Sequence, residues 1–255
     1  MVNNKLKKIF AAGKAALGSF AVCHSPDLIE ILALSGYDFV VIDNEHGPMG
    51  HESSQHLIRA AELRGMSPVV RIPNTMESTI LHTLDIGAHG IQVPQVNDAE
   101  TAAAIVRRSK YSPAGTRGVA FPRSADYGLM DMRMYFEYEN DETMIIAHCE
   151  NTKGLENLDA ICQVPGIDVV FLGPYDMSQS MGITGQVSHQ RIQEAAAKVV
   201  ETAKKYGKIA GIFVGSGAAA KERAAQGFQY ITIGTDAGLY AAKCRQEAEA
   251  FRNQE

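Results

Sequence analysis

The sequence predicts an α/β protein built as a single-domain (β/α)8 TIM barrel over residues 1–255. Eight short apolar runs alternate with stretches of helical periodicity. Dividing the 255 residues by eight gives about 32 residues per repeat, the size of one βα unit. A barrel of this type takes roughly 250 residues, so the eight units leave no room for a second domain.

The apolar runs are continuous rather than alternating, which is typical of parallel strands buried on both faces. The expected strands cover residues 19–24, 39–45, 67–73, 90–96, 143–150, 169–176, 209–215 and 229–236. After an amphipathic leading helix, the expected helices cover residues 26–36, 52–64, 76–87, 98–109, 155–163, 188–206, 217–226 and 237–251. The irregular segment 111–140 separates the two halves, and its length predicts a mixture of helix and working loop.

A doubly wound open sheet is the alternative arrangement of alternating strands and helices. That fold would place a glycine-rich G-x-G-x-x-G fingerprint after the first strand. The sequence there reads CHSPDLIE and holds no such motif, so the barrel is favoured.

Charge and composition narrow the function classes and the compartment. Lys and Arg total 24 against 29 Asp and Glu, and the net charge of −5 argues against a nucleic-acid partner. No apolar run approaches the roughly 18 residues of a membrane span, so no membrane partner is expected. The cysteines form no C-x-x-C pair, which favours free thiols and a cytoplasmic location.

Polar residues follow the apolar runs where the predicted strands end. Asp43 and His46 follow the second run, Arg71 the third, Glu150 the fifth and Asp176 the sixth. Barrel enzymes work at the carboxyl ends of their strands. This coincidence across several strands predicts an active site at that end of the barrel.

Glu150 and Asp176 end strands that are neighbours in order. Adjacent carboxylates repel each other unless a positive charge offsets them, and Mg²⁺ takes one or two carboxylates with waters and substrate oxygens. The pair therefore predicts a divalent metal site, and two surface acids in salt bridges are the alternative. The sequence has no H-x-x-x-H motif or Cys/His cluster of the kind that binds structural zinc.

Three other residues are candidates for the site, and the sequence leaves their roles open. Arg71 presents a planar fork that suits a substrate carboxylate, or it forms an ion pair with Asp43 or Glu45. His46 is either a general base or an exposed loop histidine. Asp85 could orient His46 across the loop, although spacing alone does not place it there.

Two mechanisms are disfavoured because their residues are missing. No lysine lies inside any expected strand, and Lys153 is the nearest, three residues beyond Glu150. A Schiff-base aldolase needs a desolvated lysine that faces its substrate. The sequence also holds no G-x-S-x-G nucleophile elbow.

Several motifs, in order along the chain, resemble the HpcH/HpaI aldolase family. They are VVIDNEHGP, PVVRIP, LDIGAHGIQVPQV, SPAGTRG, HCENTKGLENLDAI, PGIDVVFLGPYDMSQSMG and ITIGTDAGLY. The similarity runs from about residue 15 to about residue 245, and so many linked motifs at matching spacing are specific. The chain looks most similar to the class II, metal-dependent pyruvate aldolases of this family.

The resemblance implies a homohexamer of barrels in which the last helix, about 237–251, is exchanged between neighbouring subunits. It implies reversible aldol cleavage of a 4-hydroxy-2-oxoacid into pyruvate, or a close 2-oxoacid, and an aldehyde. It maps the ligands of a Mg²⁺, Mn²⁺ or Co²⁺ cofactor, which stabilises an enolate, onto Glu150 and Asp176. Binding of the substrate's carboxylate and keto group maps onto Arg71.

The resemblance also implies that His46 and Asp85 form a dyad for proton transfer, with Asp43 as an acid of the same loop. Segment 121–127 is expected on a loop over the barrel mouth, where its arginine would favour an acidic aldehyde. The residues expected to contact substrate beside Arg71 are Gly173, Pro174, Tyr175, His148, Phe213 and Arg123.

Two positions depart from the family's pattern. The family usually has glutamine two residues before the metal-binding glutamate, where this chain has His148. His148 and Glu150 share a strand face because side chains alternate, so His148 is either a metal ligand or a hydrogen-bonding residue in glutamine's place. Tyr175 stands where the family commonly has a small residue and is expected to reshape the aldehyde pocket.

Other functions stay open at this point. Oxaloacetate decarboxylation and cleavage of a CoA thioester would reuse the same enolate chemistry. A CoA enzyme should show basic residues for the diphosphate, and Arg107, Arg108 and Arg117 are the candidates. A non-catalytic barrel that binds or scaffolds would be favoured if the strand-end acids were missing, but they are present.

Overall fold

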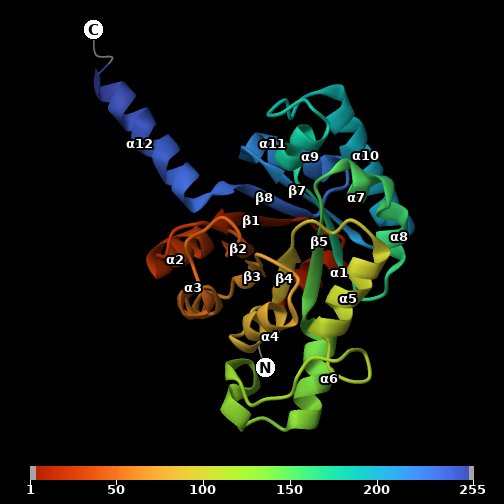
Figure 1. Ribbon diagram of the computed structural model, residues 1–255. Coiled ribbons are helices and arrows are strands. Elements are labelled where there is room, and N and C mark those ends of the chain that lie inside the picture. Colours follow the sequence, from red (N-terminus) through yellow and green to blue (C-terminus); the bar gives the residue numbers. More distant parts are fainter. Residues whose placement is uncertain (1–3, 253–255) are drawn as a thin grey trace.

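The computed structural model, which describes residues 4–252, confirms a (β/α)8 barrel. The strands are β1 (Ala16–Ala21), β2 (Phe39–Asp43), β3 (Ser67–Arg71), β4 (Gly90–Val93), β5 (Met144–Cys149), β6 (Val169–Leu172), β7 (Ile209–Val214) and β8 (Tyr230–Thr235). They pair in parallel and in sequence order, and β8 closes the ring onto β1 (Figure 1). The apolar runs were therefore correctly predicted as parallel strands.

Helices connect the strands, and most of them cover the outside of the barrel (Figure 1). They are α1 (Lys5–Ala11), α2 (Pro26–Leu34), α3 (His51–Leu63), α4 (Glu77–Asp85), α5 (Ala99–Ser109), α6 (Met132–Glu142), α7 (Thr152–Glu156), α8 (Leu158–Gln163), α9 (Pro174–Ser180), α10 (Gln190–Lys205), α11 (Gly217–Ala225) and α12 (Asp236–Arg252), with the 3-10 helix η1 (Arg123–Gly128) before α6. The helix predicted over 155–163 is divided at Asn157 into α7 and α8.

The sixth strand is shorter than predicted. It ends at Leu172, and α9 begins at Pro174 inside the range 169–176 that was expected as strand. Proline has no N–H for a central ladder but fits the first turn of a helix. This early start moves Asp176 from a strand end into the first turn of α9.

Side chains alternate between the barrel interior and the helix-facing layer. On β2, Phe39 and Val41 point into the barrel, and Val40 and Ile42 pack outward toward the helices. The interior cluster comprises Leu6, Ala16, Phe20, Phe39, Val41, Val69, Met144, Ile146, Val169, Phe171 and Tyr230. Packing on both faces accounts for the continuous apolar runs in the sequence.

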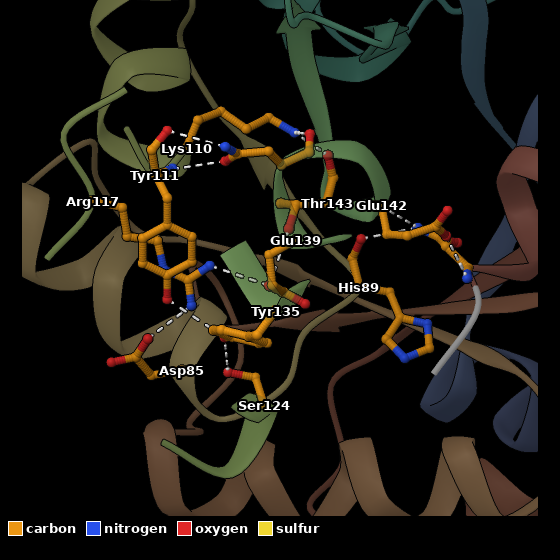
Figure 2. A network of polar contacts seen from close by, with 12 residues as sticks. Asp85, His89, Lys110, Tyr111, Arg117, Ser124, Tyr135, Glu139, Glu142 and Thr143 are labelled. Carbon is orange, nitrogen blue, oxygen red and sulfur yellow. Dashed lines mark hydrogen bonds and ion pairs between the residues drawn. The ribbon is translucent and has the colours of Figure 1, made fainter. Parts of the chain in front are cut away.

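Segment 111–140 folds as η1 and α6, which lie with α4 toward one end of the barrel (Figure 1). Its predicted mixture of helix and irregular chain is therefore confirmed. A buried polar network ties it down (Figure 2). Lys110 Nζ donates to the carbonyls of Asn140 and Thr143 at 2.7 Å each, and burial lowers the pKa of this lysine to about 8.

Helix α12 projects away from the barrel (Figure 1). Of its residues, only Asp236 is buried, where its carboxylate accepts hydrogen bonds from the N–H groups of Val22 and Cys23 at 2.9 and 3.1 Å. Leu239 in the first turn is partly buried against the barrel core, whereas Tyr240 and Phe251 further along the helix are exposed. Among residues 4–252, no helix combines the length and apolarity needed to cross a membrane.

Candidate active site

A pocket of about 190 Å³ opens at the carboxyl end of the barrel strands. Its lining residues are Phe20, Asp43, His46, Arg71, His148, Phe171, Gly173, Pro174, Tyr175, Asp176, Phe213 and Thr235. They come from the ends of β1, β2, β3, β5, β6, β7 and β8 and from the first turn of α9. The structure therefore brings together most of the residues that the sequence placed at strand ends.

Arg71 is held in the pocket by two carboxylates. Its Nε and Nη2 donate to Asp43 Oδ1 and Oδ2 at 2.8 and 2.5 Å, and its Nη1 lies 3.2 Å from Glu45 Oε2. The guanidinium carbon lies 4.7 Å from the centre of the Phe20 ring. The ion-pair interpretation of Arg71 is thus realised, and the pairing orients the guanidinium in the pocket wall.

Asp43 also shapes the loop that carries His46. Its Oδ1 accepts from the backbone N–H groups of Glu45 and His46 at 3.1 and 3.2 Å. Burial raises the pKa of Asp43, but the hydrogen bonds and charge of Arg71, with those N–H groups, hold it below its ordinary value. The loop turns so tightly that a Cβ at Gly47 would lie 2.2 Å from the Asp43 carbonyl oxygen, so this position requires glycine. His46 is left 68% exposed at the pocket rim.

Glu150 is a buried carboxylate with both oxygens engaged. Its Oε1 accepts from the Gln95 N–H at 2.7 Å, and its Oε2 lies 2.6 Å from His148 Nδ1. Gln95 has a φ of 55°, a left-handed conformation uncommon for a residue other than glycine. Burial raises the pKa of Glu150, but these hydrogen bonds and the charge of Arg71 lower it below its ordinary value.

Glu150 and Asp176 converge beside Gly173. A Cβ built at Gly173 would lie 3.4 Å from Glu150 Oε2 and 3.6 Å from Asp176 Oδ2, so the missing side chain leaves space between the two carboxylates. Two carboxylate oxygens with room for water and substrate oxygens suit Mg²⁺ or a similar cation. Residues 4–252 hold no group of three or more His, Cys, Asp or Glu side chains placed to bind a metal. A cation here would therefore need ligands from solvent or substrate.

Aromatic rings form the apolar side of the pocket. Phe213 lies 5.9 Å from Phe20 and 6.1 Å from Tyr175 between ring centres, and Phe20 lies 6.3 Å from Phe171. Tyr175 is 56% exposed, so its ring extends from the rim toward solvent. The pocket thus combines a charged floor with an apolar wall.

Asp85 is not brought together with His46 within one protomer. It is the last residue of α4, near the barrel end where the strands begin, whereas His46 follows the carboxyl end of β2. Figure 2 shows Asp85 beside Arg117, whose Nη2 donates to Asp85 Oδ1 at 2.8 Å. Arg117 is fully buried, also contacts Glu139 at 3.2 Å, and lies over the Tyr111 ring.

Arg123 also lies away from the predicted place. The expectation that segment 121–127 covers the barrel mouth is wrong for a single protomer. Arg123 forms an ion pair with Glu62 and donates to the carbonyl of Ile86 at 3.1 Å. Glu62 and Ile86 lie at the ends of α3 and α4, near the start of the strands, because those helices run back from the barrel mouth. The segment is long enough to fold down along the barrel.

Two site residues were missed in the sequence, Gln95 and Phe20. Gln95 supplies an N–H to Glu150, and Phe20 lies under the guanidinium of Arg71. Glu45 was named as an alternative ion-pair partner of Arg71, and the structure shows that contact together with the one from Asp43. Phe20 was missed because the first strand was predicted over 19–24, which placed Phe20 near its start, whereas β1 ends at Ala21 and Phe20 lies at its carboxyl end. The role of Gln95 depends on its positive φ, for which its residue type carries no signal.

Comparison with known proteins agrees with the fold and shows the family. The sequence model of HpcH/HpaI aldolase/citrate lyase matches residues 16–242. The chain belongs to the HpcH/HpaI aldolase/citrate lyase family. The hydroxypyruvate/pyruvate aldolase of Cupriavidus necator is 35% identical over 254 residues, covering 99% of this chain and 94% of that protein.

Other members of the family are similarly close over their full length. The 5-keto-4-deoxy-D-glucarate aldolase of Salmonella arizonae is 32% identical, covering 98% of this chain and 97% of that protein. The crystal structure of an HpcH/HpaI aldolase from Desulfitobacterium hafniense superposes with a TM-score of 0.93 at 32% identity, covering 98% of this chain and 97% of that one. Family membership thus rests on sequence and on fold.

Proposed function

We propose that this protein is a metal-dependent carbon–carbon lyase that reversibly cleaves a 4-hydroxy-2-oxoacid into pyruvate, or a close 2-oxoacid, and an aldehyde. The observation that carries the proposal is the convergence of Glu150 and Asp176 on the space beside Gly173, in the same pocket as a pre-oriented Arg71. The named aldolases among the relatives support the same reaction class.

Glu150 and Asp176 are the residues that would hold the cofactor, a divalent cation such as Mg²⁺, Mn²⁺ or Co²⁺. A bound cation would supply Lewis acidity that stabilises the enolate of pyruvate. Glu150 suits this role because its pKa lies below its ordinary value, so it stays ionised at neutral pH. Asp176 is exposed at the pocket mouth, where it can reach a cation without being desolvated first.

Arg71 binds the carboxylate and keto group of the 2-oxoacid in this proposal. Asp43 and Glu45 already contact its guanidinium, so an incoming substrate carboxylate finds a guanidinium whose position is fixed. Negative charge that develops on the keto oxygen during cleavage is stabilised by a donor that needs no reorganisation. Asp43 contributes by holding the arginine rather than by touching substrate.

His46 is the candidate for moving the proton of the aldol hydroxyl. It lines the pocket and is exposed, with Nε2 at 3.9 Å from Glu45 Oε2, so its ring can approach a substrate at the rim. Asp85 of the same protomer is engaged with Arg117 at the other end of the barrel. A dyad of His46 and Asp85 therefore requires that the aspartate come from a second copy of the chain.

The aldehyde half of the substrate fits against the aromatic wall. Phe213 and Tyr175 face each other beside the charged floor, and Tyr175 narrows the mouth on that side. Gly173 and Pro174 bound the pocket next to Asp176, where a larger residue at Gly173 would fill the space between the carboxylates. Arg123 can contact the aldehyde only from another protomer.

The proposed assembly is a homohexamer in which α12 is exchanged between subunits. α12 projects from the barrel with Tyr240 and Phe251 exposed (Figure 1), which is costly unless a partner covers them. Segment 119–134 carries a second exposed apolar set, comprising Val119, Phe121, Tyr127, Leu129 and Met134. The four cysteines are free, which agrees with the proposed cytoplasmic location.

The structure weakens the case for a CoA substrate. Arg117 is fully buried in ion pairs with Asp85 and Glu139 and cannot reach a diphosphate. Arg108 donates to the carbonyl of Thr75 at 2.6 Å. Oxaloacetate decarboxylation uses the same enolate and is therefore included as an arm of the assay.

The experiment is a panel of aldehydes incubated with pyruvate and Mg²⁺, Mn²⁺ or Co²⁺, with oxaloacetate as a separate substrate. Aldol product should form with the cation and disappear with EDTA and in Glu150→Ala. The matched control is Glu156→Ala, an exposed carboxylate on α7, which should behave as wild type. Full activity in EDTA or in Glu150→Ala would contradict the proposal, and pyruvate release from oxaloacetate without any aldol product would favour the decarboxylase.

A further inference from the structure

A row of buried polar side chains runs across the barrel interior beneath Glu150. We propose that Tyr230, Gln92 and His148 are positioning residues, and that Tyr230 fixes the ring proton with which His148 holds the Glu150 carboxylate. This inference rests on the proposed function, because it gives Glu150 the role of a metal ligand. It assigns His148 the role of a positioning residue and not that of a ligand.

The row consists of four side chains joined by three short contacts. Tyr230 Oη donates to Gln92 Oε1 at 2.8 Å, and Gln92 Nε2 lies 2.7 Å from His148 Nε2. His148 Nδ1 lies 2.6 Å from Glu150 Oε2. The four side chains come from β8, β4, β5 and the residue after β5, and none is more than 4% exposed.

The direction of the hydrogen bonds follows from the chemistry of each group. The Tyr230 hydroxyl donates to the amide oxygen, so the NH₂ group of Gln92 faces His148. An amide NH₂ can only donate, so His148 Nε2 must accept and the ring proton must sit on Nδ1. His148 then donates to Glu150 Oε2 as a neutral ring, and each of the three links in the row joins one donor to one acceptor.

The same links leave His148 without a nitrogen for a metal. Nδ1 is directed at Glu150, and Nε2 is directed at Gln92. The ring is also stacked on Phe171 with 4.9 Å between centres, which restrains its rotation. A histidine placed this way fixes the orientation of a ligand, as hydrogen-bond partners of metal ligands generally do.

The end of the row at Tyr230 is buried among aromatic rings. Tyr230 is fully buried, and its ring lies 4.2 Å from that of Phe39 and 5.8 Å from that of Phe171. Tyr230 therefore has no direct contact with solvent, which suits a row that holds groups in place. If the Gln92 amide were reversed, its oxygen would face His148 Nε2. His148 would then need a proton on both ring nitrogens, a state that NMR distinguishes from the neutral ring.

The first test reads the His148 tautomer in the metal-free protein by two-bond ¹H–¹⁵N NMR of ¹⁵N-histidine-labelled protein. The signal is assigned by its loss in His148→Gln. We expect a neutral ring with the proton on Nδ1, and a mixture of tautomers in Tyr230→Phe, which keeps the ring but removes the donor. A doubly protonated ring, a proton on Nε2, or no change in Tyr230→Phe would overturn the proposal.

The second test titrates Mn²⁺ into chelator-treated protein. Tyr230→Phe should weaken binding about 3–10-fold and His148→Ala about 10–100-fold. His148→Gln, which restores a donor, should stay within about tenfold of wild type in both Mn²⁺ binding and aldol cleavage. Tyr135→Phe is the matched control, since its buried hydroxyl contacts Ser124 at 2.6 Å outside the row, and it should bind as wild type.

The outcomes separate this inference from the proposed function. Complete loss of Mn²⁺ binding in His148→Gln would show that His148 is a ligand and overturn the inference. Wild-type protein that binds no divalent cation would contradict the proposed function, whereas the tautomer measurement in metal-free protein decides the hydrogen-bonded row by itself. If Tyr230→Phe does not fold, the wild-type tautomer and the two His148 variants still give a decision.

Discussion

The guanidinium of Arg71 is clamped by the carboxylate of Asp43 through two contacts of 2.8 and 2.5 Å. The pairing is planar and bidentate in character, which is a geometry that arginine forms and lysine cannot. Since Asp43 also accepts the N–H of His46, one buried carboxylate sets the position of two pocket residues. The arginine and the loop should therefore respond together to changes at this pair.

Arg71→Lys should lower kcat/KM by about 100-fold or more, because an ammonium cannot hold Asp43 and a substrate in the same plane. Steady-state kinetics with pyruvate and an accepted aldehyde measure this effect. Arg64→Lys is the control, since Arg64 forms an ion pair with Glu30 on the surface. Equal loss in both variants, or no loss in Arg71→Lys, would remove the special role of Arg71.

Asp85→Asn should destabilise the protein by about 2 kcal/mol, because it leaves the fully buried Arg117 with one carboxylate instead of two. Urea unfolding measures the change. The control is Glu137→Gln, at the exposed ion pair of 3.6 Å with Arg133 on α6, which should unfold as wild type. A stability equal to wild type would mean that the Asp85–Arg117 contact has no structural role.

Lys110 predicts a specific dependence of stability on pH. Burial lowers its pKa in the folded protein to about 8, below the 10.5 of a free lysine. The unfolded chain therefore holds the proton over a range in which the folded protein has lost it, so stability rises with pH between about 8 and 10.5. Relative to Lys110→Met, wild type should gain about 2 kcal/mol from pH 7 to pH 10. A difference that stays flat over this range would contradict the lowered pKa.

Removing the projecting helix tests the assembly. Deletion of residues 237–255 should lower the mass of the oligomer in light scattering, because α12 has little contact with its own barrel. Tyr240→Asp, at an exposed aromatic residue on the same helix, should act in the same direction. If the deleted and full-length proteins had the same number of subunits, helix exchange would be refuted.

The barrel could be predicted from the sequence because each strand is buried on both faces and therefore reads as one apolar run. The carboxyl ends of those runs also located Asp43 and Arg71, which line the pocket, and Glu150, which lies beside Gly173 of that pocket, since a closed barrel brings all such ends to one mouth. β6 was predicted too long because the apolar pattern continues through Leu172 to Pro174, where a helix begins.

Other features depend on geometry that the sequence does not carry. Segment 121–127 lies near the end of the barrel where the strands begin because of contacts such as the ion pair of Arg123 with Glu62. These two residues are far apart in the sequence. Gln92 and Tyr230 were visible as polar groups inside apolar runs. Their connection to His148 required the barrel to close β4, β5 and β8 around one interior.

The most direct measurement is exchange of the pyruvate methyl protons in D₂O, followed by ¹H NMR without any aldehyde. It reports enolate formation, which is the central step, and it does not require the natural aldehyde to be known. With Mg²⁺ or Mn²⁺, wild type and Glu156→Ala should catalyse exchange, while EDTA-treated wild type and Glu150→Ala should not. Exchange that survives both EDTA and Glu150→Ala, or no exchange with any divalent cation, would contradict this account of the site.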